Sequence, residues 1–157
     1  MTRHSPLFLC GLIALSGCLP RRIPGTDLDD TPDVRAIMTV MELYRSALEA
    51  QDAKALVDLA DPSFQDDAGT PNVADDLDFK ALQNVLPQRL SKLADVKLDL
   101  DVRKIDVSPD RRHAVATYYF VARFRPLGVE TKAQREMDLK QMTFLSDGKA
   151  WRITSGY

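Results

Sequence analysis

The chain has 157 residues, of which 45% are hydrophobic and 28% are charged, and its formal net charge is −2 at pH 7. This length and composition are typical of one globular domain and exclude an intrinsically disordered chain. Basic residues are not in excess over acidic ones, so nucleic acid is not an expected partner.

The first 17 residues have the layout of a secretory signal peptide. Arg3 precedes an apolar run over 6–15, and small residues follow it. A run of about ten apolar residues is half of the roughly 20 that a membrane-spanning helix needs. The sequence therefore predicts a signal peptide over 1–17 rather than a membrane span. The alternative is an uncleaved hydrophobic leader.

The segment Leu15, Ser16, Gly17 and Cys18 resembles the lipobox of bacterial lipoproteins, a Leu-small-small-Cys pattern. The resemblance implies that the first three residues are recognised for signal cleavage, and that Cys18 is the lipid attachment site. Two or more acyl chains hold a protein at a membrane stably, at about 0.8 kcal/mol per buried CH₂. Leu19 after the cysteine implies a lipid anchor in the cell envelope, on the periplasmic side of the outer membrane of a Gram-negative bacterium.

The segment after the cysteine separates the anchor from the folded part. Residues 18–31 are rich in Pro, Gly and Asp and show no hydrophobic period, which predicts an extended lipidated tether. At about 3.5 Å per residue this tether reaches at most roughly 45 Å from the bilayer. Cys10 lies in the leader, so no intramolecular disulfide is expected. The folded domain is predicted over residues 32–157.

Helical spacing of apolar residues predicts three helices at the start of the domain. The first two are expected over 33–50 and 52–61, and the third begins at Asp78. Proline breaks helices, so Pro87 is expected to interrupt the third helix and to open a further helical piece that reaches Leu93.

From Val96 the apolar period changes from 3.6 to 2, which predicts strands over 96–107, 113–125 and 133–145. Asp147-Gly148 is a hairpin signal that leads into a fourth strand. The predicted fold class is α+β, with three N-terminal helices packed in the concavity of a curved four-stranded antiparallel sheet, like a cone.

Two irregularities in the alternation predict that the sheet is bent. Apolar positions jump from 102 to 105 in the first strand and from 139 to 142 in the third. Each jump is a one-residue phase slip, which a β-bulge absorbs while it bends the strand. A sheet bent around helices encloses a hollow. The alternative is that the strands end early.

Two stretches, YRSALEAQDAKALVDL and DGKAWRITSGY, together with the order of helices and strands, are similar to the nuclear-transport-factor-2-like superfamily. Its relatives include ketosteroid isomerases and polyketide cyclases. The resemblance covers residues 33–157 and implies the cone-shaped fold. It implies no reaction, because the superfamily contains enzymes, binding proteins and scaffolds.

Four side chains are expected in the hollow, namely Tyr44, Arg45, Tyr118 and Trp151. Arg45 falls within the apolar arc of the first helix, so its charge must reach solvent or a carboxylate. An aromatic hollow with one cation fits a small apolar or anionic ligand. The alternative is that these side chains fill the core and that Arg45 pairs with a loop aspartate.

No metal site, cofactor or catalytic residue is assigned. His113 is the one histidine after the leader, and with no free cysteine this excludes the usual zinc ligand sets. The loop over 61–78 contains six aspartates, but it lacks the alternating spacing of a calcium loop.

Three functions therefore stay open. The preferred one is a non-catalytic domain that binds a small ligand or a protein and is held at the membrane by its N-terminal lipid. The second is an isomerase-type or cyclase-type enzyme that uses Tyr118 and a loop acid such as Asp76. The third is a structural homodimer formed through an apolar patch on the outer sheet face, Val115, Thr117, Tyr119 and Val121.

Overall fold

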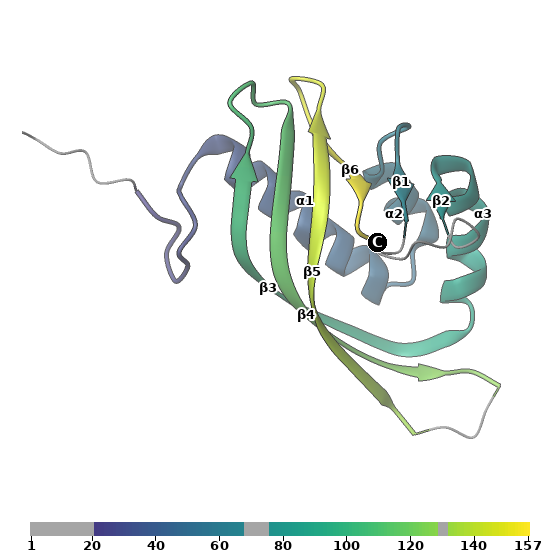
Figure 1. The fold of residues 1–157 in the computed structure, drawn as a ribbon. Helices are drawn as coiled ribbons and strands as arrows, with labels where there is room; N and C mark the ends of the chain where they lie inside the picture. The colour runs from purple at the N-terminus through teal and green to yellow at the C-terminus, as the bar shows by residue number, and fades with distance from the viewer. Residues whose placement is uncertain (1–20, 68–75, 129–131) are drawn as a thin grey trace, which may run out of the picture.

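The computed structural model describes residues 21–67, 76–128 and 132–157 (Figure 1). Three helices precede the main sheet: α1 (Pro32–Glu49), α2 (Ala53–Leu59) and α3 (Phe79–Leu90). A small antiparallel sheet joins β1 (Gln65–Asp66) to β2 (Leu77–Asp78). The main sheet follows in the antiparallel order β3 (Leu93–Val107), β4 (His113–Pro126), β5 (Gln134–Ser146) and β6 (Trp151–Ser155). The predicted α+β class is confirmed.

Each helix begins directly after a side chain that caps it. Thr31, Asp52 and Asp78 accept hydrogen bonds from the backbone N–H three residues later, at 3.2, 2.9 and 2.6 Å. These bonds satisfy amides that have no partner inside the helix. The predicted starts of the three helices are therefore confirmed within one residue.

The predicted break at Pro87 is wrong. Helix α3 continues through Pro87 as far as Leu90, and Leu93 begins β3 instead of lying in a further helical piece. Proline removes one backbone hydrogen bond from a helix. Leu86 and Leu90 lie on either side of Pro87 and are both buried, so the apolar face of α3 is continuous across the proline. Burial of this face compensates for the missing bond.

Strand β3 bends where its pairing with β4 is shifted. Register shifts lie between Ala94 and Lys97 and between Val102 and Lys104. The second shift is the bulge that the sequence predicts. In Figure 1, β3, β4 and β5 curve around the long helix α1.

The bulge predicted for the third strand is wrong, because β5 stays in continuous register with β4 over residues 134–145. The apolar side chains of β5 instead change face. Met137 and Leu139 are 66% and 49% exposed on the outer face, whereas Met142 and Phe144 are buried on the inner face. The phase slip therefore marks the point where β5 leaves the core. Inner positions before that point carry polar residues.

The main core lies between α1 and the concave face of the sheet. It is formed by side chains that are at most 2% exposed, including Ile37, Met41, Leu56, Ala116, Phe144 and Ile153. Segments from both ends of the domain meet there, because Ala60 forms a parallel bridge with Ile153 of β6. The core therefore fixes α1 and α2 against the C-terminal half of β5, over residues 142–146.

The described part of the predicted tether is folded rather than extended. Arg22 and Asp29 form an antiparallel bridge, and the turn between them places Leu28 in the protein with only 4% of its surface exposed. Asp30 accepts a hydrogen bond from Arg35 of α1, which lowers the pKa of Asp30. Composition did not signal this hairpin, because its contacts with the domain are one buried leucine and one ion pair with α1, between Asp30 and Arg35.

We predict that Gly156→Ala destabilises the protein more than Gly148→Ala. Both glycines have positive φ, +96° and +87°, but a Cβ at residue 156 would lie 2.3 Å from the Gln141 carbonyl oxygen, while one at residue 148 meets nothing within 4 Å. Positive φ alone costs a residue with a side chain about 1–2 kcal/mol. The overlap should bring the loss at Gly156 to about 3 kcal/mol or more.

Urea unfolding of both variants measures this difference. In Gly148→Ala the free energy of unfolding should fall only by the cost of placing an alanine at positive φ. Equal losses in the two variants would contradict the close approach of β5 to Gly156.

Candidate ligand-binding site

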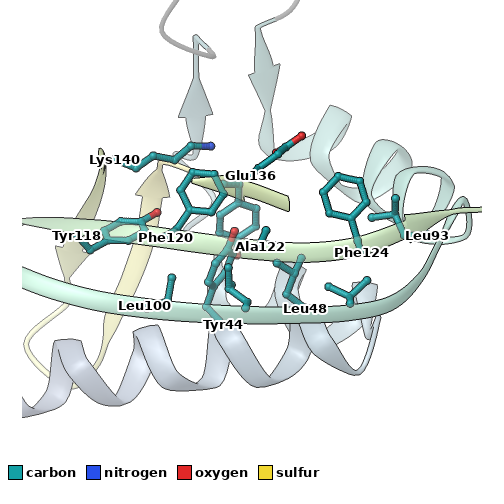
Figure 2. A pocket seen from close by; sticks show the side chains of 13 residues that line it. Tyr44, Leu48, Leu93, Leu100, Tyr118, Phe120, Ala122, Phe124, Glu136 and Lys140 are labelled. Carbon is teal, nitrogen blue, oxygen red and sulfur yellow. The ribbon is translucent and has the colours of Figure 1, made fainter. Parts of the chain in front are cut away.

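A cavity of about 250 Å³ lies between the C-terminal half of α1 and the concave face of the sheet (Figure 2). Its apolar lining consists of Leu48, Leu93, Val96, Leu98, Leu100, Phe120, Ala122 and Phe124. Its polar lining consists of Tyr44, Tyr118, Tyr157, Glu136 and Lys140. The cavity is therefore a largely hydrocarbon space with phenol groups and two charged side chains.

Strand periodicity explains why these residues share one space. Side chains two apart on a strand point to the same face, so the even-numbered residues of β4 over 118–124 all face α1. Tyr44 and Leu48 are four residues apart on α1 and therefore lie on the same helix face. Ala122 is small and leaves room between the larger side chains.

The three cavity phenols differ in their hydrogen bonds. Tyr157 donates to the Leu56 carbonyl oxygen at 2.5 Å, and Tyr118 lies 3.4 Å from the carbonyl oxygen of Gly156, a long and weak contact. Tyr44 is 8% exposed, and none of the described residues forms a hydrogen bond with its hydroxyl group. A buried hydroxyl without a partner costs about 1–3 kcal/mol, so this group is poised to bind a polar atom.

Burial keeps these phenols neutral. It raises the pKa of Tyr118 to about 12 and raises the pKa of Tyr44 and Tyr157 well above the ordinary value. The negative charge of Asp66 adds to the shift at Tyr44 and Tyr118. At physiological pH the three side chains are therefore hydrogen-bond donors and cannot serve as bases.

Glu136 and Lys140 are the cavity residues that the sequence analysis missed. They lie on the inner face of β5, because β5 has no bulge and Lys140 pairs directly with the inward-facing Tyr118. The ammonium group of Lys140 lies 4.6 Å from the centre of the Phe120 ring. The signal that identifies both residues is the plain two-residue period, which puts positions 136 and 140 in phase with the buried Met142.

The structure brings Tyr44 and Tyr118 together in this cavity and places the other two predicted side chains elsewhere. Arg45 lies in a groove between α1 and β3, since one helical step turns it about 100° from Tyr44. It pairs with Glu42 at 2.5 Å and Glu49 at 3.2 Å, both on its own helix, and not with a loop aspartate.

Trp151 is buried but does not line the cavity. It begins β6 and pairs with Ser146, the last residue of β5. The cavity residue Glu136 lies near the other end of β5. Trp151 therefore packs in the core, most of a strand length away from Glu136. The expectation that Trp151 shares a hollow with Tyr118 and Arg45 is therefore not met.

The acid–phenol pair that the enzyme hypothesis names is not formed. Asp76 is exposed and lines a separate depression with Asp66 and Asp78. Asp66 accepts hydrogen bonds from the backbone N–H groups of Gly156 and Tyr157, at 2.9 and 3.0 Å. Among the hydrogen bonds of the described residues, none joins a cavity phenol to a carboxylate.

The remaining predicted sites fall outside this region. Leu15, Ser16, Gly17 and Cys18 lie outside the described residues. Within the described ranges, no group of three or more His, Cys, Asp or Glu side chains is arranged to hold a metal ion. No helix in that part of the chain is long and apolar enough to cross a bilayer.

Comparison with solved structures identifies the fold of this chain. No protein-family model and no curated protein matches the chain. A ketosteroid isomerase-like protein from Erwinia carotovora atroseptica matches with a TM-score of 0.66 and 10% identity, over 80% of this chain and 94% of that one. A nuclear transport factor 2-like superfamily protein from Salmonella enterica matches at 0.64 and 15%, over 80% and 88%.

A protein with a cystatin-like fold from Caulobacter vibrioides matches with a TM-score of 0.63 and 14% identity, over 80% of this chain and 87% of that one. Identities this low establish the fold alone. The chain therefore shares the cystatin-like fold of the nuclear transport factor 2-like and ketosteroid isomerase-like proteins.

Proposed function

We propose that this chain is a lipid-anchored envelope protein whose domain binds a small, mainly apolar ligand in the cavity, without catalysis. The observation that carries the proposal is the buried Tyr44 hydroxyl, which has no hydrogen-bond partner among the described residues. A ligand atom that accepts a hydrogen bond from this hydroxyl would remove the cost of burying an unsatisfied donor. The surrounding hydrocarbon supplies affinity for an apolar body.

The size of the cavity limits the ligand. An engineered apolar cavity of about 150 Å³ binds benzene. The cavity here is about 250 Å³, which suits one ring with a short substituent. Binding is favoured over catalysis because Asp76, the acid named for the enzyme alternative, lines a different depression from Tyr118.

The lipobox at residues 15–18 supports the anchor. Because the hairpin over 21–30 is folded against α1, only the short stretch from Cys18 to Arg21 would link lipid and domain. At about 3.5 Å per residue this stretch spans roughly 11 Å, so the domain would sit close to the membrane surface.

We predict that Cys18→Ser abolishes maturation and membrane attachment, because serine has no thiol to receive the diacylglyceryl group. Intact-mass analysis of the wild-type protein from membranes should show loss of residues 1–17 and gain of acyl chains. Alkaline extraction should release the variant but not the wild type. Unprocessed wild-type protein that fractionates like the variant would contradict the anchor.

We predict that Ala122→Phe abolishes ligand binding, because the larger side chain fills the cavity. Cinnamate and cinnamamide are suitable probes, since each is one ring with a short substituent. Ligand-observed NMR on the mature protein should show saturable binding of at least one of them. Val121→Phe is the matched control, because Val121 is the neighbouring residue on the outer face of β4. Equal binding by both variants would contradict the cavity as the site.

A second candidate role, dimer formation, is favoured by an apolar patch on the outer sheet face. Tyr119 pairs across the strands with Leu139, and Val121 pairs with Met137. Tyr119 is 42% exposed, and the two β5 partners are more exposed still. The two β5 residues, Leu139 and Met137, enlarge the patch that the sequence predicts on β4. Exposed apolar side chains that adjoin in this way are typical of protein contact surfaces.

We predict that the mature protein without its acyl chains forms a dimer, so that its molar mass doubles as its concentration is raised. Met137→Lys should keep the protein monomeric, because a charge in the patch opposes burial. Light scattering after size-exclusion chromatography measures the mass. Leu127→Lys is the control, since Leu127 is 47% exposed and lies outside the patch. A wild-type monomer at high concentration would exclude the dimer.

A further inference from the structure

We infer that the cavity ligand is a monoanion, a single-ring or similarly compact apolar molecule with one carboxylate or equivalent group that Lys140 binds. This inference rests on the proposed function, and it names the chemical class of the ligand and the residue that selects it. Three observations carry it, namely the position of Lys140, the lack of a counter-ion for it among the described residues, and the distribution of charged groups around the cavity.

Lys140 is placed to meet a ligand rather than bulk solvent. It is half-buried on the inner face of β5, and its ammonium group lies over the Phe120 ring at 4.6 Å from the ring centre. Figure 2 shows its side chain reaching over the cavity, near Tyr118. Phe120 is itself a lining residue, so the charge lies against the apolar wall.

Among the described residues, no carboxylate lies within ion-pair distance of Lys140. Other lysines do have one. Lys54 lies 2.5 Å from Asp58, and Lys97 lies 3.6 Å from Glu49. A half-buried ammonium without an anion gains most from an anionic ligand, because charge-assisted hydrogen bonds are about twice as strong as neutral ones.

The cavity has a cationic end, and the opposite end is lined by apolar side chains together with Glu136. Lys140 and Tyr118 lie at one end in Figure 2, whereas Phe124 and Leu93 lie at the other. The Tyr118 hydroxyl has only the weak 3.4 Å contact described above, so it can donate to the same carboxylate that pairs with Lys140. The second oxygen of the carboxylate can accept a hydrogen bond from the unpartnered hydroxyl of the lining residue Tyr44, and the ring of the ligand then lies against the hydrocarbon of the cavity wall.

The acidic residue of the cavity limits the ligand to a single negative charge. Glu136 lies on the same face of β5 as Lys140, about 13 Å away along the strand at 3.3 Å per residue. A second anionic group on the ligand would lie beside Glu136, which lines the cavity. A dianion is therefore disfavoured by like-charge repulsion.

Calorimetric titration of the mature protein with cinnamate and cinnamamide tests the inference, because the two probes differ in charge and hardly in shape. Wild-type protein should bind cinnamate about five- to tenfold more tightly at low salt, and added salt should reduce this ratio. Lys140→Met keeps the aliphatic stem and removes the charge, so cinnamate should lose more affinity than cinnamamide and the ratio should fall to about one. Lys149→Met, at an exposed lysine in the β5–β6 turn, should keep the wild-type ratio.

The outcomes distinguish a failure of the monoanion inference from a failure of the proposed function. Equal affinities for the two probes in the wild type, or a cinnamate preference that survives in Lys140→Met, would overturn the monoanion while leaving a binding cavity. Failure of the wild type to bind either probe would overturn the cavity function and the monoanion together.

Discussion

The change of apolar face along β5 decides where this domain has a core and where it has a cavity. Residues 142–146 send Met142 and Phe144 inward, where they pack with α1. Residues 134–141 send Glu136 and Lys140 inward, and charged groups cannot be covered by apolar packing without a large desolvation cost. The sheet nevertheless continues past the core because its ladder with β4 is unbroken. The space between this continuation and α1 is the cavity.

The C-terminal segment completes the cavity from the opposite side. Asp66 of the small sheet accepts hydrogen bonds from the N–H groups of Gly156 and Tyr157, which holds the last residues beside β5. Gly156 lies so close to Gln141 that only a glycine fits there. The Tyr157 ring then packs at 5.2 Å from Tyr44, between centres. The small sheet, the last residues and α1 thus position the phenol groups as one unit.

Helix α1 separates the two functional ends of the domain. The hairpin over 21–30 packs at its N-terminal end through Leu28 and Asp30, whereas Tyr44 and Leu48 line the cavity in its C-terminal half. Tyr44 lies twelve residues beyond the first residue of α1, a rise of about 18 Å at 1.5 Å per residue. The hairpin and the cavity are therefore separated by most of the length of α1.

Local patterns in the sequence determined the element order, the helix starts directly after Thr31, Asp52 and Asp78, and the bulge near Val102. These features depend on neighbouring residues, since caps, turns and two-residue alternation act over a few positions. Tyr44 and Tyr118 follow from the same periods, because each lies on the apolar face of its element. The tertiary structure decided the rest. The faces of β5, the continuity of α3 through Pro87 and the hairpin around Leu28 all depend on which distant surface covers them. The same holds for the charged residues of the cavity, because whether Lys140 faces a ligand or solvent depends on where the core ends.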